Sequence, residues 1–299
     1  MRGYDKKPLQ ENGEITMQSL TFHEGKFHEG NPMIMGPMDQ SFWFASMIFD
    51  GARAFDGIMP DIERHMTRCL NSARIMNMAP QETVEDLIEL AGDMARKFPA
   101  DKQLYIRPTY WCGETDDLAP IPELTKFLMV LQVAPMEEPT GFSAMKSSYR
   151  RPSPDQAPTL AKASCLYPTS GEALLEARRN GYQNAAMADA NGNIAEFATA
   201  NLFIAKDGEV HTPVPNGTFL NGITRQRVIG LLQDAGQTVV ERTLTWKDLE
   251  EADEIFSTGN YSKVVPLAKF GERDMQPGPI YRKARELYFT FARDTGYRL

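Results

Sequence analysis

The stretch GNIAEFATANLF, residues 192–203, decides the fold of the second half of the chain. The Asn-Gly pair at 191–192 and the Asp-Gly pair at 207–208 flank it, and both dipeptides are strong hairpin signals. We therefore expect antiparallel strands here. Glu196 is an acid inside an apolar strand, and a buried carboxylate needs a partner. Taken alone, the pattern favours a salt bridge or an edge position over the protonated nitrogen of a bound heterocycle.

The stretch LNGIT, residues 220–224, opens a predicted helix after a glycine turn. Free backbone N–H groups at the start of a helix form a ready phosphate site. The simpler interpretation is an ordinary helix start capped by Thr224. Apolar residues at helical spacing continue the helix as far as Gly236.

The stretch PTLAKASCLY, residues 158–167, places Lys162 among small and apolar neighbours. Burial lowers the pKa of a lysine, and covalent catalysis on carbonyl compounds requires the neutral amine. Tyr167 offers a phenol partner nearby. Taken singly, such a lysine is more often a surface residue and such a tyrosine more often core. Arg68 can either bind a phosphate through two hydrogen bonds from its planar guanidinium or face the solvent.

The remaining elements form two α+β units, because strands and helices do not alternate as a doubly wound sheet requires. Helical spacing, with Thr83 and Asp86 as a capping box, and strand composition predict the elements of the first unit at 61–76, 83–98, 103–111 and 125–133. Those of the second unit are predicted at 171–179, 184–188, 194–197, 202–206, 222–236, 254–257 and 280–295.

Domain boundaries follow from composition. Residues 135–156 are rich in proline and are predicted to be a linker between a small N-terminal domain, 1–134, and a larger domain, 157–299. Residues 23–30 repeat the tripeptide His-Glu-Gly, which does not fit the HExxH zinc motif. We expect a polar loop or hairpin there.

Composition excludes several classes of protein. The chain has 299 residues and a net charge of −8, without the basic excess of a nucleic-acid binder. Its longest apolar runs are too short to span a bilayer, and residues 1–10 lack the apolar core of a secretory signal. The 3 cysteines and 4 scattered histidines favour a reducing cytoplasm and no metal site. No dinucleotide, P-loop or hydrolase motif is present.

The order of the candidate residues is more informative than any one of them: Arg68, Lys162, Glu196, then Gly-Ile-Thr at 222–224 and Thr-Gly-Asn at 258–260. This order resembles the class IV aminotransferases, the pyridoxal-phosphate enzymes of fold type IV. The branched-chain amino acid aminotransferases are the most similar subgroup. The resemblance runs from Phe-Asp-Gly-Ala-Arg at 49–53 to the Thr-Gly-Asn turn.

The resemblance implies a two-domain α+β fold that binds pyridoxal 5′-phosphate. Lys162 matches the lysine that binds the cofactor covalently and shuttles the α-proton. Glu196 matches the acid that pairs with the pyridine nitrogen, and Arg68 the arginine that binds the phosphate. The other matching cofactor positions are Tyr167, Thr199, Leu220, Ile223, Thr224 and Asn260.

The first domain is expected to supply the substrate pocket. Tyr105 and Arg107 match positions that recognise substrate carboxylates, and strand alternation puts both on one face. Arg53 and Phe44 match further pocket residues. The family is dimeric, which implies a homodimer in which residues 111–118 close the neighbouring pocket.

The implied reaction transfers an amino group from a branched-chain or similar amino acid to a 2-oxo acid, with 2-oxoglutarate as the expected acceptor. Several positions depart from the branched-chain pattern: Asp50 replaces a glutamate, Phe44 a tyrosine, Ala45 a glycine and Asn260 a threonine. A D-amino acid or (R)-amine transaminase, a lyase such as aminodeoxychorismate lyase, and a non-catalytic binding protein are therefore alternatives. The arginines favour a dicarboxylate co-substrate and the L-amino acid interpretation.

Overall fold

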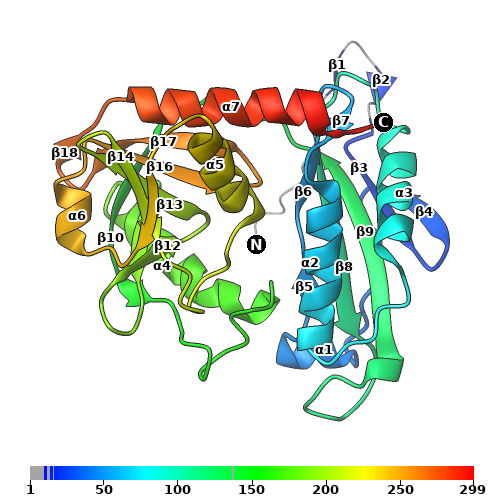
Figure 1. Cartoon of the computed structure of the whole chain (residues 1–299). Helices are drawn as coiled ribbons and strands as arrows, with labels where there is room; N and C mark the ends of the chain where they lie inside the picture. The colour runs from blue at the N-terminus through cyan, green and yellow to red at the C-terminus, as the bar shows by residue number, and fades with distance from the viewer. Residues whose placement is uncertain (1–9, 12–13, 16, 137) are drawn as a thin grey trace.

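The computed structural model describes residues 10–11, 14–15, 17–136 and 138–299. Its backbone forms two main β-sheets with helices packed on them, which confirms the α+β prediction (Figure 1). The smaller sheet is antiparallel, with the order β4-β3-β9-β8-β5 and with β6 paired to β8. Its strands are β3 (Ser19–His23), β4 (Lys26–Glu29), β5 (Ile48–Phe49), β6 (Ala52–Ala54), β8 (Leu104–Cys112) and β9 (Thr125–Val133).

Two amphipathic helices, α2 (Ile62–Ile75) and α3 (Val84–Ala95), cover one face of this sheet (Figure 1). The helical spacing of Met66, Cys69 and Ala73 points their side chains inward, and all three are fully buried. Thr83 and Asp86 form the predicted capping box of α3. A short helix, α1 (Gln40–Phe44), leads into β5.

The larger sheet has the order β12-β11-β10-β17-β16-β13-β14-β15, with β18 paired to β17. Parallel and antiparallel pairs are mixed in it. Its strands are β10 (Phe142–Arg150), β11 (Asn184–Ala188), β12 (Ile194–Phe197), β13 (Asn201–Lys206), β14 (Glu209–Pro213), β15 (Val239–Arg242), β16 (Glu254–Gly259), β17 (Lys263–Phe270) and β18 (Arg273–Asp274).

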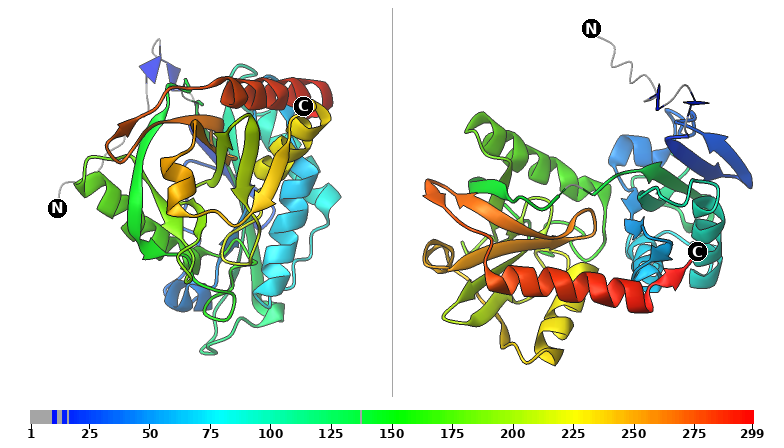
Figure 2. Two further views of the ribbon diagram at one scale, coloured as in Figure 1. Left: turned by 60° about the vertical axis from the view of Figure 1, so that its left-hand side comes forward. Right: turned by 90° about the horizontal axis from the view of Figure 1, so that it is seen from above.

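The last helix joins the two sheets. Helix α7 (Pro279–Thr295) packs on α5 (Ile223–Asp234) and on the larger sheet, and its end reaches β7 (Ile58–Met59) beside the smaller one (Figure 2). The strand that follows, β19 (Tyr297–Arg298), pairs with β7. The C-terminal segment therefore holds the two sheets in contact.

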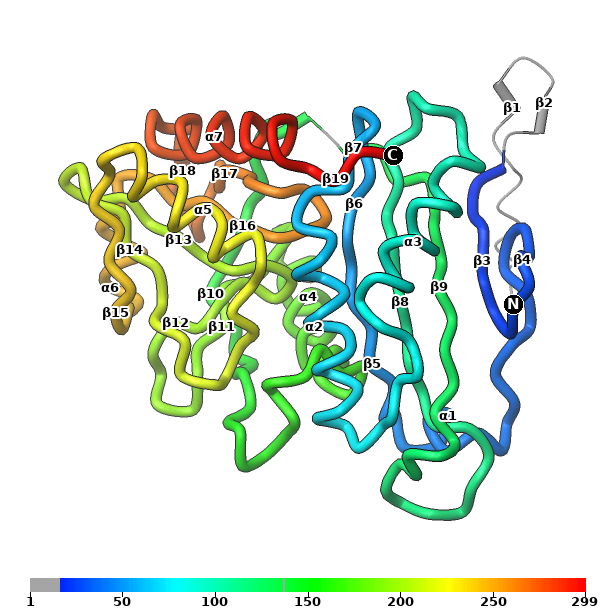
Figure 3. The backbone as a smooth tube through the Cα atoms, turned by 45° about the vertical axis from the view of Figure 1, so that its right-hand side comes forward, coloured from blue at the N-terminus to red at the C-terminus, as the bar shows by residue number. Residues whose placement is uncertain are grey.

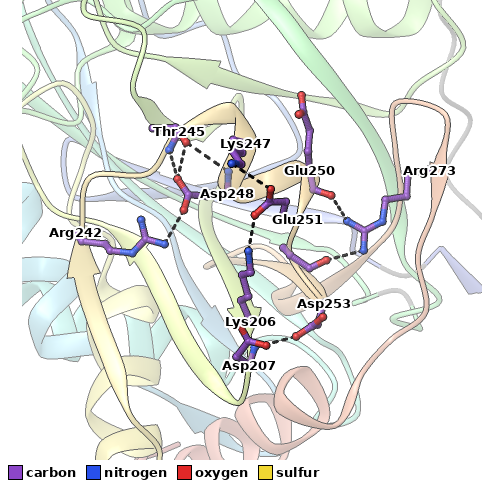
Figure 4. Close-up of polar contacts among 11 residues, drawn as sticks. Lys206, Asp207, Arg242, Thr245, Lys247, Asp248, Glu250, Glu251, Asp253 and Arg273 are labelled. Carbon is purple, nitrogen blue, oxygen red and sulfur yellow. Dashed lines mark hydrogen bonds and ion pairs between the residues drawn. The ribbon is translucent and has the colours of Figure 1, made fainter.

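The outer edge of the larger sheet is fastened by ion pairs around α6 (Trp246–Glu250) (Figure 4). Asp248 accepts hydrogen bonds from Thr245 in a capping box and pairs with Arg242 at 2.7 Å. Lys206 pairs with Glu251 at 2.6 Å. Arg273 donates to two backbone carbonyls at the end of α6. These contacts are exposed or partly buried and lie on the side of the larger sheet away from the smaller sheet (Figure 1).

Most predicted elements are confirmed, including the hairpin at 23–30, which is formed by β3 and β4. The helix predicted at 171–179 begins earlier, as α4 (Tyr167–Arg179). The predicted linker 135–156 contains β10, which pairs with β11 and β17. Prolines flank β10 and none lies inside it, so they delimit this strand. The division into domains at 134 and 157 stays a prediction.

Figure 3 follows the chain from the N-terminal strands, at the far edge of the smaller sheet, to the C-terminus. The first short pair is β1 (Gln10–Glu11) with β2 (Glu14–Ile15). The absence of a secretory signal was predicted for residues 1–10, and residues 1–9 lie outside the described part of the chain. Among the described residues, no helix combines the length and apolarity needed to cross a bilayer, and no cluster of potential metal ligands occurs.

Candidate active site

Lys162 is fixed in place by contacts between its backbone and the smaller sheet. Its N–H donates to Ser72 Oγ of α2 at 3.1 Å, and its carbonyl accepts from Phe49 N of β5 at 3.1 Å. The flanking residues Ala161 and Ala163 are fully buried. Because small side chains pack on both sides, the lysine side chain is left to point into the cavity between the sheets, which it lines.

Tyr167, the first residue of α4, faces the lysine amine. Lys162 Nζ donates to Tyr167 Oη at 2.7 Å, and the ammonium lies 4.9 Å from the centre of the Phe49 ring. Phe49 also packs against Tyr167, with ring centres 5.1 Å apart. The amine therefore has a hydrogen-bond partner and lies against aromatic rings.

Glu196 enters the same cavity from β12. Its two oxygens have different partners: Asn201 Nδ2 donates to Oε2 at 3.1 Å, and Arg151 Nε lies 3.3 Å from Oε1. Burial raises the pKa of Glu196 to about 7, although the nearby charges of Arg151 and Lys162 act in the opposite direction. A carboxylate at this pKa can share a proton with a weak base.

The start of α5 forms a cup on the cavity wall. Gly222 is its N-cap and makes no side-chain capping bond. The backbone N–H groups of Ile223 and Thr224 therefore remain available to donate hydrogen bonds, as is usual at the start of a helix. Within the described chain, Thr258 Oγ1 and Asn260 Nδ2 are buried without a hydrogen-bond partner, and both residues line this wall. Unsatisfied buried donors beside a helix N-terminus fit an anion.

Arg225 holds this helix start against the sheet. Its side chain is almost fully buried and donates to Asn221 Oδ1, Glu241 Oε2 and the Pro213 carbonyl. Gly222 has a different constraint, since a Cβ there would lie 2.1 Å from Asn201 Oδ1. A side chain at 222 would therefore displace the amide that supports the cavity acid.

Arg68 is held by a buried carboxylate. Its Nε and Nη2 donate to the two oxygens of Asp50 at 2.7 and 2.9 Å, and His65 Nδ1 lies 2.8 Å from Asp50 Oδ1. Burial lowers the pKa of His65 to about 4, against the raising effect of Asp50. His65 is therefore neutral at pH 7, and Nδ1 carries the hydrogen that bonds Asp50. Despite burial, Arg68 and His65 hold the pKa of Asp50 well below its usual range.

We expect this cluster to make the free energy of unfolding depend on pH. The folded-state pKa of His65 is depressed, so its contribution is present above the unfolded value of about 6.5 and is lost as pH falls toward 4. Over that window the unfolding free energy should fall by up to about 1.4 kcal/mol per pH unit. Urea titrations of wild type and His65→Asn, which keeps a donor but cannot titrate, measure it. Equal slopes for the two proteins would contradict the assignment.

The structure brings most of the predicted site residues to one cavity. Those that line it are Arg68, Tyr105, Lys162, Tyr167, Glu196, Thr199, Leu220, Ile223, Thr224 and Asn260. They come from both sheets and from α2, α4 and α5. The Tyr105 phenol packs against Gly51, where a Cβ would lie 2.0 Å from the phenol oxygen. Burial raises the pKa of Tyr105 to about 12.

The other three predicted residues lie elsewhere. Arg53 is fully buried beneath the cavity, donates to the Tyr261 and Ala134 carbonyls, and stacks on the Tyr261 ring. Phe44 is 45% exposed on α1. Arg107 lines a second hollow, which shares Phe49 with the cavity. Backbone carbonyls accept hydrogen bonds from the Arg53 guanidinium, and the substrate-binding role of Arg53 stays a prediction.

Several cavity residues were not predicted: Phe49, Gly51, His65, Arg151, Ser170, Thr258 and Tyr261. Arg151 was assigned to the linker, yet it donates to the Thr218 carbonyl and to Ser170 Oγ beside the cavity acid. The Arg-Arg pair at 150–151 is the available signal, since an arginine that becomes buried needs partners.

Comparison with known proteins identifies the family. The sequence pattern of the family described as Amino-transferase class IV matches residues 47–270, most of the chain and all of the cavity residues. The chain belongs to the class IV aminotransferases. It is an aminotransferase of fold type IV, as the sequence predicted.

Individual relatives agree with this assignment. The probable branched-chain-amino-acid aminotransferase of Aquifex aeolicus is 31% identical over 290 residues, covering 92% of each chain. A crystal structure of an aminotransferase from Brucella abortus bound to PLP is 47% identical, with a TM-score of 0.91, covering 92% of this chain and 99% of that one. The Escherichia coli branched-chain amino acid aminotransferase structure is 28% identical, with a TM-score of 0.84 over 92% and 95% of the two chains.

Pyridoxal phosphate is accordingly the cofactor of this enzyme, as predicted. The cavity fits it on independent grounds. The unsatisfied donors beside α5 suit a phosphate, and the desolvated acid Glu196 suits a pyridine nitrogen. Lys162 and Glu196 line one cavity, so the same bound molecule can contact both side chains.

Proposed function

We propose that this aminotransferase moves an amino group from a branched-chain or similar L-amino acid to 2-oxoglutarate. The observation that carries the proposal is the pair of adjoining hollows. One holds Lys162 and Glu196, and the other is mainly apolar and holds Arg107. Phe49 lines both, so a substrate can occupy the second hollow with its α-carbon at the first.

The second hollow supports an apolar donor. Its lining includes Met35, Met47, Trp111, Leu128 and Val130, which together suit an aliphatic side chain. Arg107 stands among these residues as a cation that can bind the distal carboxylate of a dicarboxylic acceptor. One hollow can then accept both partners of the exchange.

The cofactor supplies an electron sink for the bond that breaks at the substrate α-carbon. The chain's own residues do the remaining work. Lys162 Nζ carries the α-proton, and Tyr167 Oη, 2.7 Å away, orients that amine. Glu196 holds a proton at the pyridine nitrogen, with Asn201 and Arg151 fixing the carboxylate. Arg68 and the α5 start hold the phosphate.

A donor and acceptor panel tests the substrate proposal. The purified enzyme is assayed with L-amino acids, D-amino acids and (R)-amines against 2-oxoglutarate and pyruvate. We expect the highest kcat/KM for an aliphatic L-amino acid with 2-oxoglutarate. Preference for a D-amino acid or an (R)-amine would overturn the donor assignment. Pyruvate released from aminodeoxychorismate without an acceptor would indicate a lyase instead.

Arg107 should determine acceptor choice. Because it is the cation that lines the apolar hollow, Arg107→Met should lower kcat/KM for 2-oxoglutarate by roughly 10- to 100-fold, the range for losing a charge-assisted bond. The value for a monocarboxylic 2-oxo acid should change much less. Steady-state kinetics with both acceptors measure this.

Arg53→Met provides the matched control. The Arg53 guanidinium is buried against two backbone carbonyls, so its loss should destabilise the fold and lower activity equally for both acceptors. A loss selective for 2-oxoglutarate in Arg53→Met, with none in Arg107→Met, would support Arg53 and not Arg107 as the residue that binds the distal carboxylate.

A homodimer in the cytoplasm belongs to the same proposal. Large apolar side chains are exposed on α1 and on the loop after β8: Phe42, Trp43 and Leu118 are 63%, 65% and 73% exposed. A second copy covering them would place residues 111–118 at the neighbouring pocket. The cysteines are free thiols, which suits a reducing compartment. Light scattering at assay concentration tests the dimer, and a monomer would contradict it.

A further inference from the structure

Lys263 is a buried cation without a carboxylate partner. It opens β17, its side chain is 1% exposed, and within the described residues it forms no ion pair. Its ammonium lies 5.4 Å from the centre of the Tyr288 ring of α7. Desolvating a lysine costs free energy that a methionine of similar length would avoid. A lysine at this place therefore calls for a further explanation.

The polar contact of this lysine reaches the cavity wall. Lys263 Nζ donates to Asn260 Oδ1 at 2.5 Å. An ammonium group has hydrogens to donate and no lone pair to offer, so the amide oxygen must face it. The Asn260 amide nitrogen consequently faces away from the lysine. That nitrogen is the buried donor left without a partner beside the start of α5.

We propose that Lys263 is a positioning residue for the phosphate of the cofactor: it fixes the Asn260 amide with Nδ2 directed at the phosphate and places a positive charge behind it. This inference rests on the cofactor site described above. A threonine, which the branched-chain pattern has at this position, needs no such orientation because its hydroxyl rotates freely. The exchange to asparagine makes the lysine necessary.

The surrounding charges are consistent with this role. Burial lowers the pKa of Lys263 to about 7, and the neighbouring Arg53 acts in the same direction, while Asp61 opposes both. The positive charge of Lys263 in turn helps to lower the pKa of His65. An anion beside Asn260 would favour the charged lysine, and the charged lysine would favour the anion.

The test compares ligands with and without a phosphate. The dissociation constants of the full-length apoprotein for pyridoxal phosphate and for pyridoxal are measured by absorbance, in wild type, Lys263→Met, Asn260→Thr and the double variant. We expect Lys263→Met to weaken pyridoxal phosphate binding by about tenfold, the scale of a hydrogen bond to a charged group, and to leave pyridoxal binding unchanged. In the Asn260→Thr background, the same lysine substitution should have little effect on either ligand.

Two outcomes would overturn the proposal: unchanged pyridoxal phosphate affinity in Lys263→Met, or equal losses for both ligands. Failure of wild type to bind pyridoxal phosphate would instead refute the cofactor site itself. If Lys263→Met does not fold, Lys263→Gln, which keeps a neutral donor, replaces it with the same expectation of a phosphate-specific loss. The shift in melting temperature caused by inorganic phosphate gives a second readout, which should shrink in the lysine variant.

Discussion

Replacing Lys162 with alanine is expected to abolish transamination and to leave the fold intact. In the proposed mechanism this side chain carries the α-proton and attaches the cofactor covalently, so turnover should fall by about 10⁴-fold or more. Ala161 and Ala163, not the lysine side chain, fill the packed positions around it. The melting temperature of the apoprotein should therefore remain close to that of wild type.

Lys206→Ala is the matched control for this variant. Lys206 pairs with Glu251 on the exposed edge of the larger sheet, and such pairs contribute little to stability (Figure 4). Both variants lose one lysine charge. We expect turnover to be lost only in Lys162→Ala, and we expect the two variants to have similar melting temperatures. Near-wild-type turnover of Lys162→Ala would exclude this lysine as the catalytic residue.

The fold was predictable where its signals are local. The turn at 191–192, the apolar run of β12 and the glycine before α5 are each set by neighbours in sequence, and the structure has these elements at the expected places. Strand β10 was missed because its sequence mixes polar and apolar residues in a proline-rich segment. Its pairing with β11 and β17 depends on residues distant in the chain.

The site residues that belong to a short local motif could be predicted from the sequence. Lys162, Glu196 and the α5 start could be recognised from their order along the chain, although none was decisive singly, and one cavity unites them. Arg53 could not be placed, because its carbonyl partners lie 81 and 208 residues away. Arg151 was overlooked for the same reason, since its link to Glu196 depends on how β10 lies beside β11.

Asp50 shows how a departure from the family pattern can be accommodated. Asp50 is fully buried, and both its oxygens contact Arg68, while a third bond runs to His65. The carboxylate therefore positions Arg68, the arginine proposed to bind the phosphate, from behind the cavity. Sequence indicated that this position differs from the branched-chain pattern. Only the structure shows that the Asp50 side chain is close enough to α2 to contact Arg68 and His65.

Replacing Glu196 with glutamine is expected to damage catalysis far more than folding. The buried carboxylate, with its pKa near 7, can hold a proton on the pyridine nitrogen, whereas an amide cannot. We expect kcat to fall by roughly 10²-fold or more, the scale of losing an acid-base group. The unfolding free energy of the apoprotein should change by less than about 1 kcal/mol, because glutamine keeps an acceptor for Asn201 and removes a desolvated acid.

Glu254→Gln separates this role from that of an ordinary buried acid. Glu254 is 7% exposed and accepts the Ile280 and Tyr281 N–H groups at the start of α7, remote from the cavity lining. Its substitution should lower stability by about 1 kcal/mol, the cost of a weakened helix cap, with little loss of turnover. Parallel losses of stability and activity in Glu196→Gln would mean that Glu196 serves chiefly as the salt-bridge partner of Arg151. Both variants replace one buried carboxyl group with an amide, so a large loss of kcat at constant stability in Glu196→Gln alone would support an action of the Glu196 carboxyl group on the bound ring.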